Sequence, residues 1–281
     1  MRSAEGLFLV DGPVLLAEAL ESSLSVRTVY VEQDPRRGTT ERAVAAAADA
    51  GVAVRQVRTG VLAKVLDLAS PQDVVAVVEQ SSFDMEAVAR LAAASSRPIL
   101  ALVEVSDPGN VGTLVRSAEA SGCAGAVLVG ECADVFNPKA VRATAGAVFR
   151  VPTARCDSLA ELASVAERAA MPLVGTVGGD GVTPESVAMH AAVVIVVGSE
   201  AHGLAEKDLR LCGQLVTVPM EGRVESLNAA VAGSLLAFEA ARQRRQRSAT
   251  AVGPEPSGGA RAPLSHNGGP SNHDQSATGE P

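Results

Sequence analysis

Apolar and polar residues alternate in short blocks over the first third of the chain, and this pattern predicts a small αβ unit. Runs of Val and Leu predict strands, whereas Ala-rich blocks with charged residues at helical spacing predict helices. Asp11-Gly12-Pro13 fits the cap and first turn of a helix, where a Pro costs no hydrogen bond. We expect strands at 7–10, 26–32, 52–57 and 74–79, and helices at 13–21, 39–50 and between 82 and 93.

A stronger rhythm of strands and helices begins at Ile99 and predicts a second α/β unit. Strands joined by helical crossovers lie parallel, and nearly continuous Val and Leu is typical of parallel strands buried on both faces. We therefore expect a small αβ domain over 1–96 and a domain with a mainly parallel sheet over 97–247. The expected strands of this sheet are 99–105, 126–129, 173–176, 193–197 and 215–218.

The pattern ends after a long Ala-rich helix that follows Ser226-Leu227-Asn228 and finishes in the basic run 242–247. From Ser248 onward the chain consists mostly of Gly, Pro, Ser, Asn and Ala without periodicity. Such a composition cannot bury a core. We predict a disordered tail over 248–281.

Composition and charge limit the class of protein. Of the 281 residues 47% are hydrophobic, which supplies ample core for two units, but only 2% are aromatic. That scarcity argues against a site that stacks bases on aromatic side chains. The net charge of the chain is −8, and residues 1–96 contain nine basic and thirteen acidic residues. Any bound nucleic acid therefore needs a local basic patch. The candidate patches are Arg36, Arg37, Arg55, Arg58, Lys139, Arg142 and 242–247.

The cysteines and the first residues bear on location. Cys123, Cys132, Cys156 and Cys212 have neither paired nor metal-like spacing, which is typical of reduced thiols in a cytoplasmic protein. The chain starts without an apolar signal segment, and no uncharged run reaches membrane-spanning length. We expect a cytoplasmic protein that has no membrane partner.

The first candidate segment runs from Asp107 to Arg116, directly after an expected strand. Pro-Gly makes a tight turn, Asn110 is placed as a helix N-cap, and Gly112 allows close packing of the helix start. The plain alternative is an ordinary turn with a capped helix and a solvated Arg116.

Two further candidate segments follow the last expected strands. Gly198-Ser-Glu200-Ala-His202-Gly203 is equally consistent with a loop whose carboxylate lies near a helix start. No His or Cys gives His202 a metal-ligand spacing, so we expect no metal. Pro219-Met220-Glu-Gly222 through Asn228 also fits a turn and an ordinary helix cap. Three such segments at strand ends of one unit favour a ligand site, because ligands of open α/β sheets bind there.

The three segments resemble motifs one, two and three of the SpoU/TrmH group of RNA ribose 2′-O-methyltransferases, within the SPOUT superfamily. The first motif, Asn-x-Gly-x-x-x-Arg, corresponds to Asn110, Gly112 and Arg116. The second corresponds to Gly198, Glu200 and Gly203, with Ala201 where a Gly is common. The third corresponds to Pro219, Met220, Gly222, Ser226, Leu227 and Asn228. The likeness extends from Ile99 to Arg245 and includes 137–152, and residues 9–20 resemble the start of the family's accessory RNA-binding domain.

The resemblance implies a fold, a cofactor and a substrate. Family members bind S-adenosylmethionine in a deep trefoil knot in the parallel-sheet domain, act as homodimers, and methylate the 2′-hydroxyl of a ribose. Members with such an accessory domain often modify large-subunit ribosomal RNA, so we expect 23S ribosomal RNA rather than tRNA. The cofactor contacts carry over to Thr176, Gly198, Val218, Met220 and Leu227.

The resemblance also assigns catalytic roles. Arg116 corresponds to the residue that takes the proton from the ribose hydroxyl. A guanidinium is a poor base. The alternative role of Arg116, to orient the substrate phosphate and ribose, therefore stays open. Asn110 is expected to fix the substrate or Arg116, and Glu200 to anchor the knot loops. Ser226 and Asn228 are expected to order the catalytic loop.

Two other interpretations stay open. A non-catalytic RNA-binding protein on the same scaffold is disfavoured by the intact polar residues of all three motifs. An ordinary doubly wound nucleotide-binding enzyme would need a phosphate-binding loop after its first strand, and neither G-x-G-x-x-G nor G-x-x-x-x-G-K occurs there. A methyltransferase that acts on tRNA is the remaining alternative within the family.

Overall fold

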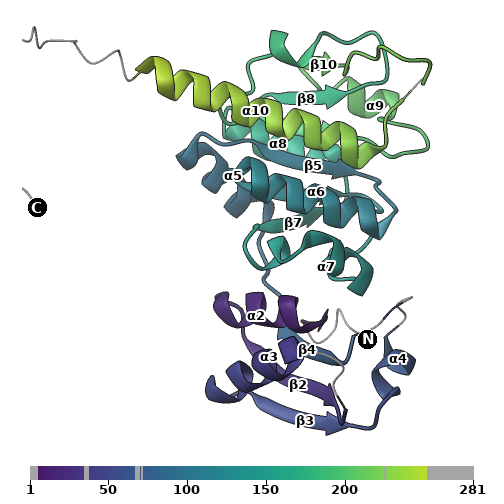
Figure 1. Cartoon of the computed structure of the whole chain (residues 1–281). Helices are drawn as coiled ribbons and strands as arrows, with labels where there is room; N and C mark the ends of the chain where they lie inside the picture. The colour runs from purple at the N-terminus through teal and green to yellow at the C-terminus, as the bar shows by residue number, and fades with distance from the viewer. Residues whose placement is uncertain (1–5, 35–37, 67–69, 71, 225, 252–281) are drawn as a thin grey trace, which may run out of the picture.

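The computed structural model describes residues 6–34, 38–66, 70, 72–224 and 226–251, which form two β-sheets with helices packed against them (Figure 1). The elements of the first unit are β1 (Leu7–Asp11), α2 (Pro13–Glu21), β2 (Val26–Glu32), α3 (Gly38–Asp49), β3 (Ala53–Val57), α4 (Val61–Val65) and β4 (Val74–Glu79). The strand order is β1-β4-β2-β3, and β4 runs antiparallel to both of its neighbours. Helices α2 and α3 pack side by side against this sheet.

The second sheet has six parallel strands, which confirms the predicted α/β fold with a parallel sheet. Its strands are β5 (Ile99–Val103), β6 (Gly125–Val129), β7 (Thr153–Cys156), β8 (Leu173–Thr176), β9 (Val194–Val197) and β10 (Gln214–Val216). Their order across the sheet is β10-β8-β9-β5-β6-β7. The edge strand β7 is absent from the expected set, because its sequence Thr-Ala-Arg-Cys contains no apolar run.

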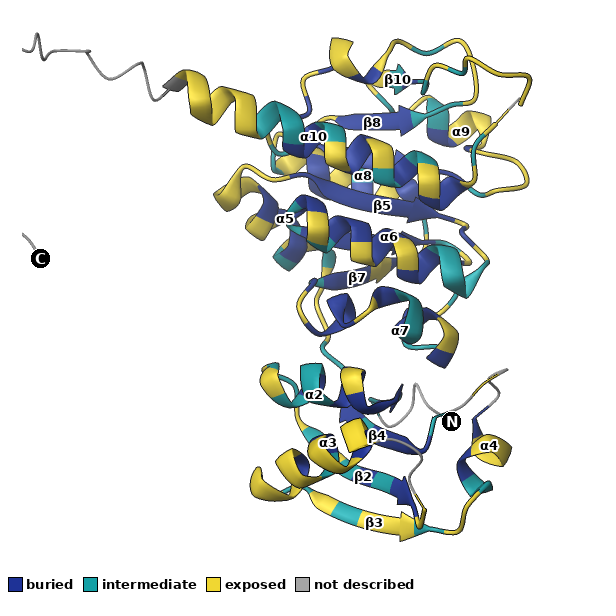
Figure 2. Ribbon diagram, viewed as in Figure 1, coloured by how far each residue is buried: buried dark blue, intermediate teal, exposed yellow. Residues whose placement is uncertain are grey.

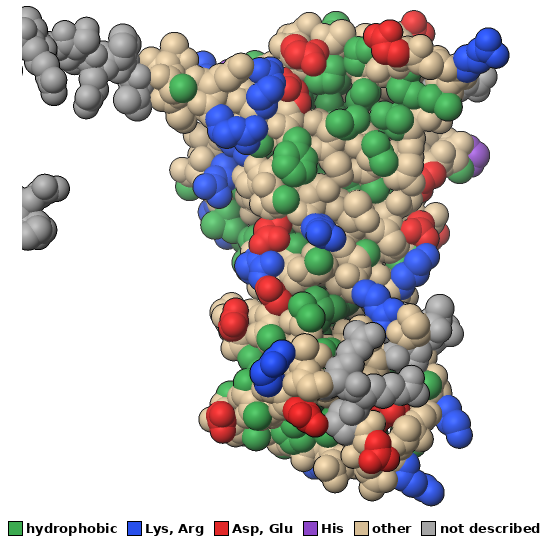
Figure 3. Space-filling view, in the orientation of Figure 1, with side chains coloured by type: hydrophobic (Ala, Val, Ile, Leu, Met, Phe, Trp, Pro, Cys, Tyr) green, Lys and Arg blue, Asp and Glu red, His purple; other side chains and the backbone are tan. Residues whose placement is uncertain are grey.

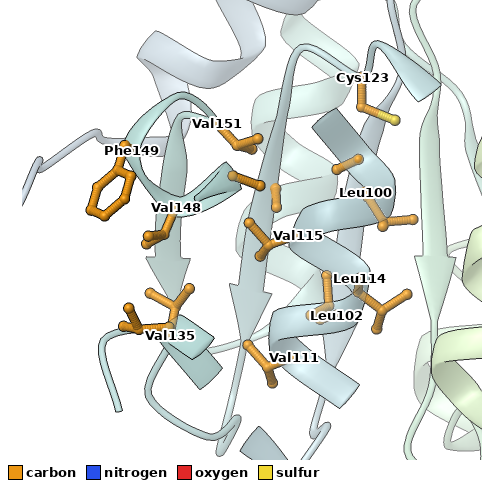
Figure 4. Close-up of a cluster of buried hydrophobic side chains, with 14 of the residues drawn as sticks. Leu100, Leu102, Val111, Leu114, Val115, Cys123, Val135, Val148, Phe149 and Val151 are labelled. Carbon is orange, nitrogen blue, oxygen red and sulfur yellow. The ribbon is translucent and has the colours of Figure 1, made fainter. Parts of the chain in front are cut away.

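Helices cover both faces of the second sheet (Figure 2). One layer contains α6 (Pro108–Ser121), α7 (Pro138–Thr144) and α10 (Ala229–Ala251), and the other contains α5 (Met85–Ser95) and α8 (Leu159–Arg168). Side chains of β5 alternate between the layers: Leu100 and Leu102 pack with α6, whereas Ile99 and Ala101 pack with α5 and α8. Figure 4 shows the first of these clusters, in which α6 contributes Val111, Leu114 and Val115. Short helical turns lie at α9 (Glu206–Leu209), η1 (Ala147–Phe149) and η2 (Pro184–Ser186).

Helix α5 packs on the second sheet, although the expected division at residue 96 counts it with the first unit. Its buried residues Val88, Ala89 and Ala92 lie in the same apolar cluster as Leu159 and Leu162 of α8. The spacing of apolar residues reveals which face of a helix is buried, but it does not identify the sheet that buries it.

The first sheet docks on α7 and η1 of the second unit. The ring centroid of Phe8 in β1 lies 4.9 Å from that of Phe136 and 6.2 Å from that of Phe149. Arg150 forms ion pairs with Glu18 of α2 and Glu119 of α6. The two units therefore share one continuous cluster of buried apolar residues.

Asp11 does not cap α2 as predicted. Gly12 occupies the N-cap position, and no side chain bonds to the helix start. The carboxylate of Asp11, whose side chain is 2% exposed, pairs with Arg142 of α7 and accepts a hydrogen bond from the backbone N–H of Gln72 at 3.0 Å. Arg142 also donates to the carbonyl oxygen of Ser70 at 2.9 Å. Asp11 thus binds partners that are distant in the sequence instead of the backbone N–H groups at the start of α2.

The last helix continues through Ala251 and overlaps the start of the tail predicted from residue 248. Ser248 Oγ donates to the carbonyl oxygen of Arg244 at 3.2 Å, and Thr250 Oγ1 donates to that of Gln246 at 2.6 Å. The small residues at 248–251 are compatible with a helix, and the first Gly and Pro come only afterwards. Residues 252–281 lie outside the described part of the chain. Within that part, no helix combines the length and apolar character that a membrane crossing requires.

Candidate active site

A cavity of about 320 Å³ lies beyond the carboxyl ends of β8, β9 and β10 and beside the start of α10. Its walls come from residues 176–178, 197–203 and 216–218 and from the segment that leads into α10. All five residues predicted to contact a cofactor line this cavity: Thr176, Gly198, Val218, Met220 and Leu227. The parallel sheet gathers these segments because its neighbouring strands end at the same edge.

The loop after β9 turns tightly around Gly198. The backbone N–H of Gly203 donates to the carbonyl oxygen of Ser199 at 2.9 Å, and a reciprocal bond of 3.2 Å closes the turn. A Cβ atom at Gly198 would lie 2.4 Å from the carbonyl carbon of Gly203, so no side chain fits there. Ala201 is absent from the described residues with positive φ, which explains why Ala is tolerated at this position.

Helix α6 begins differently from the prediction. Asp107, not Asn110, is the N-cap: its Oδ1 accepts a hydrogen bond from the backbone N–H of Asn110 at 2.9 Å. Pro108 then occupies the first helical turn, which is the local signal that could have identified Asp107. The side chain of Asn110 is thereby left available for contacts with other segments.

The amide of Asn110 joins all three motifs. Its Nδ2 donates to the carboxylate of Glu200, and its Oδ1 accepts from Nδ2 of Asn228 at 3.2 Å. Glu200 also lines the cavity. The structure thus brings together three of the predicted catalytic residues that lie far apart in the sequence.

Asn228 also caps α10, as expected for its position. Its Oδ1 accepts hydrogen bonds from the backbone N–H groups of Ala230 at 2.9 Å and Val231 at 3.2 Å. Ser226 lines the cavity and is exposed. One amide therefore fixes both the start of the last helix and the orientation of Asn110.

Arg116 lies apart from this network. It is exposed on α6, it is not among the residues that line the cavity, and it has no hydrogen-bond or ion-pair partner among the described residues. Thr113 and Ala120 share its exposed helix face at spacings of three and four residues. Within one chain, the motif-one Arg does not reach the cofactor cavity.

Further cavity residues were not predicted as site residues, among them Val177, Ser199 and His202. The backbone N–H of His202 donates to Ser199 Oγ at 3.3 Å. Their position one to four residues from a predicted contact was the only local signal.

In the described ranges, no group of three or more His, Cys, Asp or Glu residues could hold a metal ion. Burial raises the pKa of the Cys212 thiol to about 11, so this thiol stays protonated near neutral pH.

Comparison with known protein families covers most of the chain. Residues 97–238 match the model of the SpoU rRNA methylase family, and residues 1–76 match that of an MRM3-like substrate binding domain. The chain is 32% identical over 260 residues to the 23S rRNA (uridine(2479)-2'-O)-methyltransferase of Streptomyces viridochromogenes, covering 86% of this chain and 85% of the relative. It is 27% identical over 237 residues to the 23S rRNA (guanosine(2553)-2'-O)-methyltransferase RlmP of Bacillus subtilis, covering 84% and 89%.

Solved structures give the same result. The SpoU methyltransferase AviRb from Streptomyces viridochromogenes in complex with the cofactor AdoMet matches with a TM-score of 0.75 and 30% identity, over 87% of this chain and 92% of that one. The AdoMet-bound rRNA methyltransferase from Sinorhizobium meliloti matches with a TM-score of 0.74 and 30% identity, over 86% and 89%. The family resemblance seen in the three motifs is confirmed: the chain belongs to the SpoU rRNA methylase family.

Proposed function

We propose that this protein transfers a methyl group from S-adenosylmethionine to the 2′-hydroxyl of a ribose in 23S ribosomal RNA. The observation that carries this proposal is the contact between Asn110, Glu200 and Asn228 at a cavity lined by all five expected cofactor residues. Two curated relatives that align over most of this chain are named as 23S rRNA 2′-O-methyltransferases. A tRNA substrate is the alternative, and the methyl-transfer assay described below distinguishes it from 23S ribosomal RNA.

The cavity suits S-adenosylmethionine in size and chemistry. Aliphatic side chains of Val197, Val218 and Leu227 offer an apolar surface for a flat base. Backbone groups of the three surrounding loops can read the edge of that base, and the carboxylate of Glu200 can face a cationic sulfonium. Bound in this cavity, the cofactor supplies an activated methyl group.

The polar network of Asn110, Glu200 and Asn228 suits the ribose. Methyl transfer needs the 2′-oxygen aligned with the methyl carbon and the sulfur, so positioning contributes much of the rate. We propose that Asn110, held between Glu200 and Asn228, presents the substrate side of the site. Ser226 lines the cavity, and we propose that it orders the loop into α10.

We further propose that a second copy of the chain completes the site. Val231, Leu235 and Phe238 form an apolar stripe on α10 and are 48%, 47% and 47% exposed. The stripe lies on α10, which packs against α6, the helix that carries Arg116, and Figure 3 shows apolar side chains exposed on this face of the second unit. A homodimer through this face would bury the stripe and bring Arg116 towards the partner's cavity. The deep trefoil knot expected of the family would surround that cavity.

The first unit is the proposed RNA-binding part. Its match to an MRM3-like substrate binding domain supports this role. Arg42, Arg55 and Arg58 are exposed there and can contact phosphates, whereas the candidate pair at residues 36 and 37 lies outside the described residues. Packing suggests that this unit ends between β4 and α5 rather than at residue 96. We place the reaction in the cytoplasm, where ribosomal RNA is the available substrate.

Methyl transfer to defined RNAs tests the function directly. Purified protein is incubated with S-adenosylmethionine carrying a labelled methyl group and with deproteinised 23S ribosomal RNA or tRNA from a strain that lacks the gene. We expect one new 2′-O-methyl nucleotide in 23S ribosomal RNA. Labelling of tRNA alone would contradict 23S ribosomal RNA as the substrate. If calorimetry detects no binding of S-adenosylmethionine, the proposed methyltransferase activity is contradicted.

A further inference from the structure

Two charged side chains that belong to none of the three motifs, Asp107 and Lys139, fix the first turn of α6 through hydrogen bonds. Asp107 uses both carboxylate oxygens. Its Oδ1 accepts the backbone N–H of Asn110 at 2.9 Å, and its Oδ2 accepts from Lys139 Nζ at 2.8 Å. The same Asn110 whose side chain joins the motifs is therefore fixed through its backbone by this pair.

Lys139 comes from a helix start that is itself fixed. Oδ1 of Asn137, the N-cap of α7, accepts a hydrogen bond from the backbone N–H of Lys139 at 2.9 Å. Helices α6 and α7 touch directly, because a Cβ atom at Gly112 would lie only 2.3 Å from the carbonyl oxygen of Ala140. The ammonium of Lys139 thus reaches Asp107 from a rigid neighbouring element.

A side chain at position 109 would displace the carboxylate of this pair. A Cβ atom at Gly109 would lie 2.8 Å from Asp107 Oδ1 and 3.8 Å from Cε of Lys139. The hydrogen bond from Lys139 lowers the pKa of Asp107, and the N–H of Asn110 lowers it further. An ionised cap is a strong acceptor at a helix N-terminus, because its charge also opposes the positive end of the helix dipole.

We propose that Asp107 and Lys139 are positioning residues of the methyl-transfer site. Together they set the first turn of α6 and so direct the Asn110 amide at Glu200 and Asn228. Both polar atoms of that amide are engaged, so a small displacement of the helix start breaks one contact or the other. The kinetic consequence rests on the proposed function, whereas the orientation of Asn110 does not.

Asp107→Ala and Asp84→Ala make a matched pair of variants. Asp84 caps α5 in the same way, with its Oδ1 accepting the backbone N–H of Ala87 at 2.6 Å, but α5 lies on the other face of the sheet. Each loss of a cap should lower the melting temperature by about 2–4 °C. Only Asp107→Ala should also reduce kcat, by about 10- to 100-fold, with the Kd for S-adenosylmethionine changed less than about twofold.

Two conservative variants separate positioning from stability. Asp107→Asn keeps an oxygen that accepts the N–H of Asn110, so kcat should recover to within about threefold of wild type. Lys139→Met keeps the carboxylate cap and removes only the exposed ion pair, which Asp107→Asn loses as well, so its kcat should lie between those of wild type and Asp107→Asn. Equal kcat values for Asp107→Ala and Asp84→Ala would show that Asp107 is an ordinary cap and overturn the proposal.

A second measurement does not depend on activity. The side-chain NH₂ signal of Asn110 in a heteronuclear NMR spectrum reports its bond to Glu200. We expect Asp107→Ala to move this signal and Asp84→Ala to leave it in place. If wild-type protein methylates no RNA, the proposed function fails, yet an unmoved Asn110 signal in Asp107→Ala would still overturn the positioning role by itself.

Discussion

The two sheets place carboxylates at their edges in opposite ways. In the first sheet β4 runs antiparallel to β1 and β2, so at each edge the start or end of β4 lies between the opposite ends of its two neighbours, while β2 and β3 run parallel. Asp11, Glu32 and Asp73 lie there, and each is less than 9% exposed. They bind within the fold, to the N–H of Gln72, the N–H of Gly60 and the hydroxyl of Thr40. In the second sheet the strands are parallel, and Glu200 lines an open cavity instead.

The difference shows how strand direction affects what polar side chains can do. Where strand ends alternate with strand starts, a carboxylate accepts hydrogen bonds from the backbone of the neighbouring loop. It is then not available to bind a ligand. Where several strands end together, their loops separate from the sheet and enclose a space. The first unit is therefore suited to support and docking, and the second to binding a small molecule.

Arg116 and Arg142 test this contrast most strongly. Arg116 has no partner among the described residues, whereas Arg142 binds Asp11 and the carbonyl oxygen of Ser70. We expect Arg116→Ala to lower kcat for methyl transfer by about 10²- to 10³-fold while the melting temperature and cofactor Kd stay unchanged. Single-turnover assays and calorimetry measure the two quantities. An equal loss of cofactor affinity would mean that the residue is structural.

Glycines in the two units give the next largest difference. Gly198→Val should weaken S-adenosylmethionine binding by about 100-fold, because its Cβ atom would collide with the backbone of Gly203. Gly60→Ala in the first unit is the control: no atom lies within 4 Å of its Cβ, but its φ is +82°. The control should cost about 1 kcal/mol of stability and leave cofactor binding intact. Calorimetry with a normal Kd for Gly198→Val would refute the cavity assignment.

Arg142→Met should have the reverse profile to Arg116→Ala. Among the described residues, it leaves the buried carboxylate of Asp11 with the N–H of Gln72 as its one partner, which should lower the free energy of unfolding by about 1–3 kcal/mol. Cofactor affinity should persist, and KM for RNA should rise if the first unit orients the substrate. Chemical denaturation and steady-state kinetics measure these effects. An unchanged stability would show that the docking between the units does not depend on this ion pair.

Ending the chain after Ala251 should have the smallest effect. The removed residues have the composition of a segment without a core, so neither sheet should lose stability. We expect a melting temperature within about 1 °C of the full chain. A larger decrease by differential scanning calorimetry would mean that these residues contact one of the units.

Hydrophobic periodicity by itself determined most of the strands and the class of fold. The parallel strands β5, β6 and β9 are buried along their whole length, so nearly every residue in them is apolar and the signal is strong. The family resemblance indicated five cofactor contacts, and all five line the cavity, because loops that follow neighbouring parallel strands lie at the same edge of the sheet.

The tertiary structure decided which polar groups bind one another. Asp107 and Asn110 are both good N-cap residues at a spacing of three. Pro108 favours Asp107 as the cap, but the contact of the Asn110 side chain with Glu200 is seen only in the folded structure. Asp11 prefers Arg142 to the helix beside it, and α5 packs on the later sheet. Local sequence reports how strongly a residue favours burial or capping, but the choice among partners depends on contacts between distant segments that form only in the folded chain.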